Sequence, residues 1–530
     1  MKNDSIKKAS VLGIALILVS IAFIPAVNSQ FQSILNIYSK ENLKNTQQLG
    51  SRSWWDDDWP YRKLITIDHN QVDSNQNNFP VLIYSPTDSD LSNHAQNDGD
   101  DITFILYSDT TKLNHEIEYF DSITGQLVAW VNVPLLSSST DTLIWMYYGN
   151  SACSSQENIE GAWNSNYVMV QHLNEPSGTL FDSTSNDNDG TNSGATFTSS
   201  SKIDGAYDFD GTNNHIDVGT FDVANSGLTM SLWFNADTFQ ETDVTSGLRL
   251  ISKATGPETS QHYWMLAVAD WGNKIRYRLK TETQVTSNLI VDTGGLNINT
   301  WYNVVGTYDG SYMRVYIDGV ELGSKTESGA VAIDDTVSVW IGSNPPNDYR
   351  PWDGTLDEVR VSNVARDSNW ISTSYKNQNN PSTFYSIGLE EVCEHILTIN
   401  VVGNGFITLN PLGGTYPYGT VVTLTAVADP GWTFSHWSGD LSGSSNPETI
   451  TMNGNKVVTA HFTQDQYTLT VSVVGSGSVN LNPPGGTYLS YTVVTLTANA
   501  DPGWTFSHWS GDLSGSSNPE TITMNGNKVV

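Results

Sequence analysis

The fold is decided by residues 301–320, which read WYNVVGTYDGSYMRVYIDGV. Apolar and polar side chains alternate before and after Asp309-Gly310, the pattern of strands that each bury one face. An Asp-Gly pair favours a tight hairpin turn, because glycine tolerates the positive φ that such turns require. A second pair, Asp318-Gly319, closes the second run. The stretch therefore predicts two antiparallel strands joined by a hairpin.

The same pattern extends on both sides of this hairpin and predicts an all-β chain. Short apolar runs bounded by Asp, Asn, Gly and Pro fill residues 54–155, which we interpret as an antiparallel β-sandwich. Similar strand patterns fill residues 160–391, whose length suits one large two-sheet jelly roll. The predicted order is therefore a sandwich followed by a larger jelly roll.

The last part of the chain is a tandem repeat of small β units. Ala428–Val458 recurs residue for residue as Ala500–Val530, so we divide this part into residues 395–465 and 466–530. Each unit is predicted to contain several strands and a Ser/Gly/Asn loop, and such units serve as spacers as often as receptors. The second copy stops within a strand, which predicts a truncated repeat with further repeats or an anchor beyond it.

The N-terminus has the pattern of an export signal. Lysines in residues 1–8 precede an apolar run over residues 9–27, and small residues follow at 27–29. We therefore predict a signal peptide over residues 1–29 and a tether over residues 30–53. The alternative, a permanent membrane anchor, stays open because the run approaches the roughly 20 residues that a bilayer requires. In either case the remaining chain is predicted to be extracellular or on the cell surface.

The charge balance bears on the kind of partner. The formal net charge is −32, from 24 Lys+Arg against 56 Asp+Glu. Nucleic-acid binding needs clustered basic side chains, so this balance argues against a nucleic-acid partner. The abundant carboxylates instead suit hard cations such as calcium.

Motifs in characteristic order relate the three parts to known families. The first part contains WPYRK at 59–63, DGDDITF at 98–104, EIEYF at 116–120 and YYGN at 147–150. It resembles a widespread family of extracellular domains of unknown function. The second contains DSTSNDNDG at 182–190, GAYDFDG at 205–211, WYNVVGTYDG at 301–310, VYIDG at 315–319 and DGTLDEVRV at 353–361. It resembles the laminin-G-like, concanavalin-type jelly rolls. The repeats, with GWTFSHW at 431–437 and 503–509, are similar to the bacterial surface B-repeat of internalins.

The jelly-roll resemblance implies a structural calcium ion. In this family an Asp-rich loop and carboxylates near the late Asp-Glu-Val strand often hold the ion, which here means Asp182, Asp189 and Asp357. The loop over residues 182–190 places several oxygen ligands at close spacing, as Ca²⁺ requires. The alternative is a turn without a metal, because Asp and Asn favour turns on their own account.

Candidate ligand-binding residues are aromatic and polar side chains in predicted loops. Saccharide sites combine an exposed aromatic platform with polar donors and acceptors. Tyr349, Arg350 and Trp352 lie in a loop marked by three prolines, and they are the preferred candidates. The alternative is that these aromatic side chains belong to the core.

The sequence favours a binding protein over an enzyme. Neither a His-Glu-x-x-His nor a Gly-x-Ser-x-Gly motif occurs. Glu116 and Glu118 form the nearest approach to a carboxylate pair, but strand alternation predicts that both lie on the solvated face of an ordinary strand. A pair from distant strands stays open.

The two cysteines, Cys153 and Cys393, precede and follow the predicted jelly roll. Because the first and last strands of a closed sandwich lie near each other, we predict a disulfide between them in the exported protein. Two unpaired thiols are the alternative.

Together these features predict a surface adhesion or ligand-binding protein. Its jelly roll would bind an extracellular polysaccharide or a surface protein, and only the N-terminal segment or a missing C-terminal anchor would contact the membrane. An extracellular carbohydrate-active enzyme or its binding subunit, and a structural stalk or surface-layer component, are the alternatives.

Overall fold

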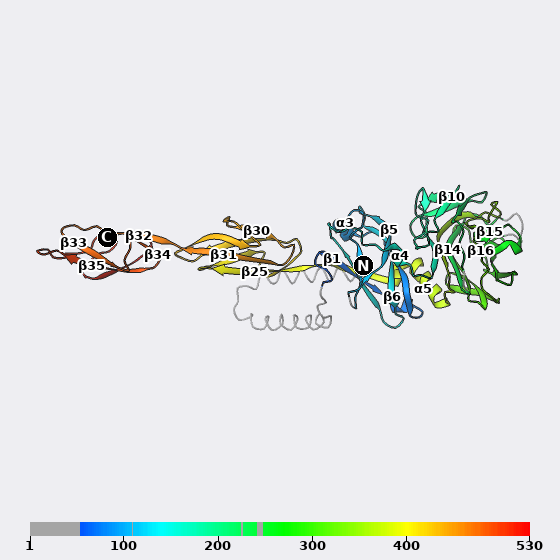
Figure 1. The fold of residues 1–530 in the computed structure, drawn as a ribbon, viewed down its shortest axis with the longest axis horizontal. Helices are drawn as coiled ribbons and strands as arrows, with labels where there is room; N and C mark the ends of the chain where they lie inside the picture. The colour runs from blue at the N-terminus through cyan, green and yellow to red at the C-terminus, as the bar shows by residue number, and fades with distance from the viewer. Residues whose placement is uncertain (1–53, 109, 224–225, 241–246) are drawn as a thin grey trace, which may run out of the picture. The chain divides into compact units, whose positions relative to one another are not determined.

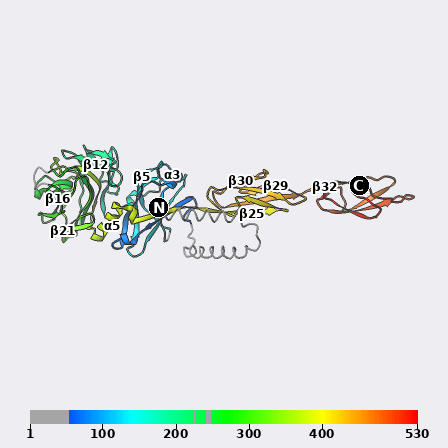
Figure 2. The ribbon, with the colours of Figure 1, turned by 180° about the vertical axis from the view of Figure 1, so that it is seen from behind.

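The computed structural model describes residues 54–530 except residues 109, 224–225 and 241–246. The predicted signal peptide and tether lie outside the described residues. Every element below belongs to the unit Asp57–Val530 (Figures 1 and 2). The all-β prediction is confirmed, because the protein is 50% strand and 7% helix. In the part of the chain that the structure describes, no helix is long and apolar enough to span a membrane.

The first domain is a two-layer antiparallel sandwich. Its sheets have the strand orders β24-β1-β7-β3-β4 and β2-β6-β5. The elements before residue 165 are β1 (Tyr61–Ile67), η1 (His69–Gln71), β2 (Gln76–Ser85), α3 (Ser89–His94), β3 (Thr103–Leu106), β4 (Lys112–Leu113), β5 (His115–Asp121), β6 (Gln126–Leu136), β7 (Thr142–Tyr148) and α4 (Ile159–Ala162). Alternating side chains of both sheets meet in one apolar core, as the period-2 pattern predicts.

One strand of this sandwich comes from far along the chain. β24 (Tyr385–Val392) pairs antiparallel with β1, from Tyr61 opposite Val392 to Ile67 opposite Tyr385. Phe384 and Tyr385 also belong to the sandwich core. The range 160–391 that we interpret as jelly roll therefore contains a strand of the first sandwich, and the jelly roll is an insertion between β7 and β24.

The helix α5 (Ser368–Asn379) leads the chain back to the sandwich, followed by α6 (Pro381–Phe384). Asp367 caps α5 by accepting a hydrogen bond from the Trp370 backbone N–H at 2.8 Å. The side chain of Asn377 bonds to both backbone groups of Leu82 in β2, at 2.7 Å and 3.0 Å. Because β2 is an edge strand, this amide satisfies backbone groups that no neighbouring strand pairs.

The jelly roll packs two large sheets face to face. Their orders are β18-β17-β16-β15-β22-β13-β10-β9 and β11-β12-β23-β14-β19-β20-β21, with β8 paired to β23. The elements are β8 (Tyr167–Gln171), β9 (Thr179–Leu180), β10 (Gly190–Ser193), β11 (Thr196–Thr198), β12 (Ala206–Asp210), β13 (His215–Asp217), β14 (Leu228–Ala236), β15 (Leu248–Ala254), η2 (Thr259–Gln261), β16 (His262–Ala269), β17 (Lys274–Lys280), β18 (Thr286–Asp292), β19 (Trp301–Tyr308), β20 (Tyr312–Ile317), β21 (Val320–Thr326), β22 (Val339–Ile341) and β23 (Asp353–Ser362).

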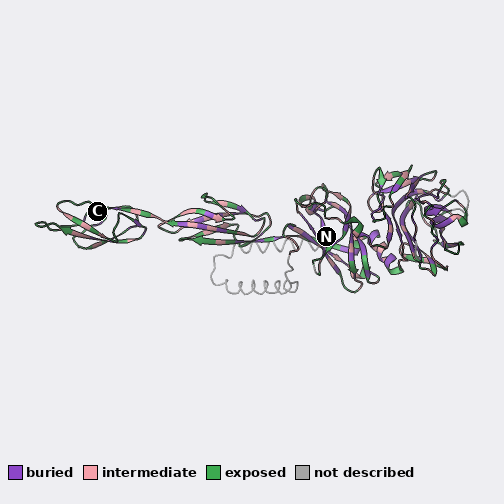
Figure 3. Cartoon of the chain, viewed as in Figure 1, coloured by how far each residue is buried: buried purple, intermediate pink, exposed green. Residues whose placement is uncertain are grey.

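The predicted hairpin over residues 301–320 is confirmed. β19 and β20 pair antiparallel from Val304 opposite Ile317 to Tyr308 opposite Met313. Gly310 at the turn has φ of +85°, the conformation for which glycine is favoured. The inward side chains of these strands contribute to one continuous core between the two sheets (Figure 3).

The two C-terminal repeats are small two-sheet units, each with its own core. In each, the first strand pairs in parallel with the last, β25 with β31 and β32 with β37. The first contains β25 (Glu394–Val402), β26 (Gly405–Asn410), β27 (Thr415–Pro417), β28 (Val421–Ala428), β29 (Trp432–Gly439), β30 (Glu448–Thr451) and β31 (Lys456–Gln464). The second contains β32 (Gln466–Thr470), β33 (Gly477–Asn482), β34 (Thr487–Leu489), β35 (Val493–Ala500), β36 (Glu520–Thr523) and β37 (Lys528–Val529).

Candidate functional site

The outer face of the sheet that contains β15, β16 and β17 carries a group of arginines. On β17, Ile275, Tyr277 and Leu279 enter the core, so Arg276 and Arg278 project from the opposite face. Register places Arg249 of β15 opposite Ala267 and Ala267 opposite Arg276. The small side chain between the two arginines leaves room for both. Strand alternation thus brings cationic groups together on one face of an otherwise acidic protein.

Burial and like charge shift the ionisation of this arginine group. Burial, together with the guanidinium groups of Arg276 and Arg350, lowers the pKa of Arg278 to about 10. Among the described residues, Arg278 Nε has no hydrogen-bond partner, although the residue is only 5% exposed. Arg278 Nε is therefore a buried donor that the fold leaves unpaired.

His262 lies within the same group and is neutral at physiological pH. Its Nε2 is 3.4 Å from Arg249 Nη2, and its Nδ1 is 3.2 Å from Arg278 Nη1. Burial and these two arginines lower the pKa of His262 to about 3. A neutral imidazole can accept a hydrogen bond, so it separates the two guanidinium groups without adding charge.

A buried asparagine fastens the proline-rich loop to this face. Asn344 Oδ1 accepts hydrogen bonds from Ser252 Oγ at 2.9 Å and Arg249 Nε at 3.3 Å, and it lies 2.8 Å from His262 Nε2. Its amide nitrogen donates to the Gly256 and Pro345 carbonyls, each at 3.0 Å. These contacts fix the start of the loop that ends at Trp352.

The structure separates the three predicted ligand-binding residues. Tyr349 is 40% exposed, whereas Trp352 is 0% exposed and packs edge-on against Phe234, with ring centroids 5.5 Å apart. Trp352 is therefore a core residue and offers no platform to a ligand. The Arg350 carbonyl accepts a hydrogen bond from the Arg249 backbone N–H at 3.0 Å, and Arg350 has φ of +66°. Tyr349 and Arg350 thus lie at the arginine group, in a loop whose backbone is left-handed at Arg350, a conformation that non-glycine residues seldom adopt.

A stacked histidine and tryptophan support the same loop. His215 lies 3.7 Å from Trp340 between ring centroids, with the rings nearly parallel. His215 Nδ1 is 2.5 Å from Asp348 Oδ1. Trp340 is opposite Ser252 in the sheet, so this stack lies on the face that carries the arginines. The loop is therefore held by Asn344 at one point and by the pair of His215 and Asp348 at another.

The residues predicted to hold calcium form a hydrogen-bonded turn. Asp182 Oδ1 accepts from the Val170 and Thr184 backbone N–H groups at 2.8 Å and 3.0 Å, and Oδ2 accepts from Asn188 N–H at 2.9 Å. Asp189 Oδ1 in turn accepts from the Asp182 N–H at 2.9 Å.

Asp357 is separate from this turn. Its Oδ2 accepts from the backbone N–H groups of Lys202 and Ile203, at 2.8 Å and 3.1 Å. Across the described ranges, the convergent ligand groups are Asp68–His69–Asp141 and Glu118–His172–Glu358, and neither includes the three predicted residues. The calcium site stays a prediction.

The predicted disulfide is not formed, because Cys153 and Cys393 are both free thiols. Cys153 Sγ is 3.3 Å from the Asn150 carbonyl, whereas Cys393 Sγ is 3.8 Å from Asp57 Oδ1. The two cysteines follow β7 and β24, which lie on opposite sides of β1 in one sheet. Two strand spacings amount to about 10 Å, more than the Cα separation of a disulfide.

The glutamates that we predicted on a solvated face are buried instead. Glu116 is 7% exposed, and the Glu118 side chain is 0% exposed. Both point to the same side of β5 as alternation predicts, but His172 and Glu358 of the inserted segment lie against them. Glu116 accepts from Trp163 Nε1 and Ser183 Oγ, each at 2.7 Å.

His172 is the centre of this second group. Its Nδ1 is 2.7 Å from Glu358 Oε1 and 3.4 Å from Glu118 Oε2, and its Nε2 is 3.3 Å from Glu116 Oε2. Burial opposes the charged imidazolium, but the three carboxylates outweigh it and raise the pKa of His172. Sequence patterns could not reveal this group, because its members come from separate segments, with His172 56 residues from Glu116 and 186 residues from Glu358.

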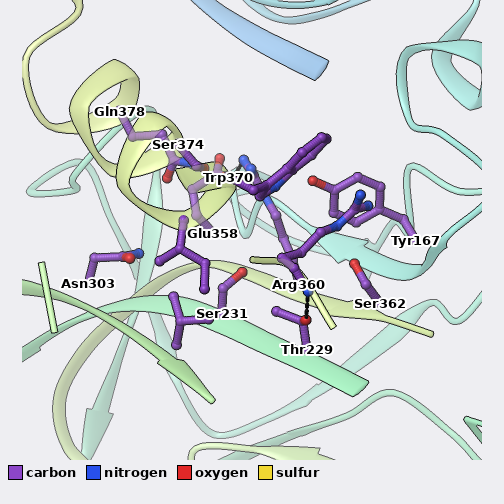
Figure 4. Close-up of a pocket in the computed structure, with 13 residues that line it drawn as sticks. Tyr167, Thr229, Ser231, Asn303, Glu358, Arg360, Ser362, Trp370, Ser374 and Gln378 are labelled. Atoms are coloured by element: carbon purple, nitrogen blue, oxygen red, sulfur yellow. Dashed lines mark hydrogen bonds and ion pairs between the residues drawn. The ribbon is translucent and has the colours of Figure 1, made fainter. Parts of the chain in front are cut away.

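A small pocket adjoins the buried group between α5 and the sheet that contains β14, β19 and β23. Figure 4 shows Ser374 and Gln378 of α5 on one side and Ser231 and Asn303 of the sheet on the other. Glu358 also lines the pocket, so one member of the buried group faces this space.

Family models match all three parts of the chain. Residues 98–194 match the Domain of unknown function (DUF2341). Residues 210–372 match the concanavalin A-like lectin/glucanases superfamily. Residues 395–466 and 467–530 each match the divergent InlB B-repeat domain. No curated protein matches the sequence.

Several solved structures are similar to parts of this chain. Domain 4 of AbnA, a GH43 extracellular arabinanase from Geobacillus stearothermophilus in complex with arabinotriose, is 18% identical, covering 40% of this chain and 98% of its own, with a TM-score of 0.33. The binding domain of Paraclostridial Mosquitocidal Protein 1 is 12% identical, covering 63% and 75%, with a TM-score of 0.32.

The botulinum neurotoxin serotype D ligand binding domain in complex with N-acetylneuraminic acid is 13% identical, covering 64% and 72%, with a TM-score of 0.32. TM-scores this low support no argument about the function of this chain. The family matches, in chain order, are therefore a domain of unknown function, a concanavalin A-like lectin/glucanase domain and two divergent InlB B-repeat domains.

Proposed function

We propose that this chain is an exported surface protein whose jelly roll binds a saccharide at the loop that carries Tyr349 and Arg350. The observation that carries the proposal is the position of the exposed Tyr349 ring in a loop fastened to the arginine-bearing face of the sheet. An aromatic ring packs against the apolar face of a sugar, and guanidinium groups donate to its oxygens. The match of residues 210–372 to a lectin/glucanase superfamily supports the same ligand class.

Binding is favoured over hydrolysis at this site. Glycoside hydrolysis needs two carboxyl groups on either side of the bond to be broken. Asp348, directly before Tyr349, is paired with His215, and the other groups that the sheet brings together there are guanidinium, imidazole and amide groups. These groups orient and retain a ligand but do not supply the acid and base of that reaction.

The surface location is supported by the repeats. Residues 395–530 match a repeat domain named after a bacterial internalin, and the repeats have cores of their own. We assign to them the role of a spacer between the jelly roll and the cell.

A glycan array with the full chain tests the proposal. We expect binding to a restricted set of glycans, reduced at least about tenfold by Tyr349→Ala, as loss of an aromatic contact would cause. Tyr312→Ala is the matched control, because Tyr312 is 42% exposed but lies on β20 of the other sheet. Equal binding by the two variants, or no binding by the wild-type chain, would contradict the proposal.

A further inference from the structure

Three side chains from separate segments converge in the buried group next to the pocket. Glu118 comes from β5, His172 directly follows β8, and Glu358 lies in β23. One ligand atom from each lies within 4.8 Å of the other two. Both carboxylates approach the same ring nitrogen, His172 Nδ1, at 2.7 Å for Glu358 and 3.4 Å for Glu118. Two carboxylate oxygens and one imidazole nitrogen therefore lie close enough together to be ligands of one ion.

Neighbouring groups hold these side chains in position. Trp130 Nε1 donates to Glu118 Oε2 at 2.7 Å, and Arg360 pairs with the second oxygen of Glu358. Glu116 Oε2 is 3.3 Å from His172 Nε2, on the side of the ring away from Nδ1. A histidine that binds a metal through one nitrogen commonly donates its other N–H to a carboxylate. The contact with Glu116 matches that arrangement and leaves Nδ1 as the nitrogen directed at the metal.

The buried group contains more carboxyl groups than cationic groups. The carboxylates of Glu118, Asp204, Asp357 and Glu358, with Glu116, interact around one imidazole and the Arg360 guanidinium. In the described part of the chain, Glu118 Oε1 and Asp357 Oδ1 have no hydrogen-bond partner, although both side chains are fully buried. An unpartnered carboxylate oxygen inside a protein is costly, and a bound cation removes that cost.

We propose that Glu118, His172 and Glu358 bind a divalent transition-metal ion of the Zn²⁺ or Mn²⁺ type. An imidazole with two carboxylates suits these ions, whereas Ca²⁺ prefers oxygen ligands alone. This site is distinct from the saccharide site, and of the predicted calcium residues only Asp357 lies near it, without being one of the three ligands. Because Glu118 belongs to the first sandwich and the other two ligands to the inserted domain, the ion joins the two domains at their contact.

The alternative is a purely organic ion-pair group. In that arrangement His172 is an imidazolium that donates from Nδ1 to Glu358 and from Nε2 to Glu116, at 2.7 Å and 3.3 Å. Such a group would also hold the two domains together. It differs from the metal site in one measurable way, because it binds no ion in stoichiometric amount.

Metal analysis of the full chain separates the two arrangements. Two preparations of the protein are compared, one produced in medium supplemented with Zn²⁺ and one refolded with Zn²⁺. Both are dialysed against a weak chelator, and their metal content is then measured by mass spectrometry. We expect one tightly held equivalent in the wild-type protein and its loss in Glu118→Gln and His172→Gln. A strong chelator that removes the ion from the wild-type protein should lower its melting temperature, because an ion that binds only the folded state stabilises that state.

The exposed group of Asp68, His69 and Asp141 supplies a matched control. His69 Nδ1 is 2.6 Å from Asp141 Oδ1, but these side chains are partly exposed. Asp141→Asn should therefore keep the tightly held equivalent. The proposal is overturned if neither wild-type preparation retains metal, or if folded Glu118→Gln, which is nearly isosteric, retains as much as the wild type. Should His172→Gln not fold, the Glu118→Gln comparison decides alone.

Discussion

Trp352 and Glu116 have burial opposite to what their local sequences predict. Trp352 follows a proline in a polar loop, yet it is 0% exposed because the chain enters β23 directly afterwards and turns the ring into the core. Glu116 lies on the polar side of an amphipathic strand, yet it is 7% exposed because another domain covers that side. Local alternation predicts which side of a strand a residue occupies. It does not predict what covers that side.

At this scale His262 provides a test of the arginine group. The pKa of His262 falls to about 3 in the folded protein, against about 6.5 for an unperturbed histidine. The unfolded chain therefore takes up the proton first, so stability is present above pH 6.5 and is lost as the pH falls. Between pH 7 and pH 5 this single group should lower the free energy of unfolding by about 2 kcal/mol.

The measurement is thermal unfolding of the wild type and of His262→Gln at pH 7 and pH 5. The variant should be less stable than the wild type at pH 7, since the contacts to Asn344 and Arg249 change. Between pH 7 and pH 5, however, the variant should lose less of its free energy of unfolding than the wild type does. An equal loss of stability in both proteins on acidification would show that His262 takes up its proton in the folded state as readily as in the unfolded chain.

At the scale of elements, strand positions could be read from the sequence but not their partners. The period-2 pattern marks β19, β20 and β23 correctly, and the Asp-Gly pair marks the turn between the first two. The same pattern marks β24, but nothing local indicates that it pairs with β1, more than 300 residues earlier. Likewise, no local pattern indicates that Asn377 of α5 forms hydrogen bonds with the backbone at the edge of β2.

The pairing of β24 with β1 predicts the effect of truncation. A chain that ends before Tyr385 lacks one edge strand, the core side chain of Tyr385 and the partly buried Ile387, and it exposes the backbone groups of β1. We expect such a chain to aggregate or to lose the melting transition of the first sandwich. A chain that ends after Cys393 keeps the strand and is the control.

Circular dichroism melting and size-exclusion chromatography of the two truncated chains make the comparison. Both chains lack the repeats, so any difference between them reflects β24 alone. Equal melting temperatures and equal elution would contradict the assignment of β24 to the first sandwich.

At the scale of the whole molecule, the domains pack together without a disulfide between them. The chain has two cysteines, and both are free. A disulfide around so long a loop would stabilise the protein by more than about 4 kcal/mol in the loop-entropy model. Burial also raises the pKa of both thiols, that of Cys393 to about 11, so neither is a reactive thiolate at neutral pH.

We therefore expect a reducing agent to leave the melting temperature of the whole chain unchanged. Alkylation after denaturation without reductant should add two labels, as seen by intact mass. An unlabelled protein whose melting temperature falls on reduction would show that oxidation joins the two cysteines in solution.

The insertion of the jelly roll between β7 and β24 has a mechanical consequence. β1 begins at Tyr61 and β24 ends at Val392, and these two residues are opposite each other in the ladder. Tension applied between the segment before β1 and the repeats after β24 therefore enters the sheet at one end and would unzip this ladder pair by pair. The jelly roll lies off the load path until the ladder has opened. Tension between these two segments would therefore not reach the inserted domain, or a ligand held by it, before the β1–β24 ladder separates.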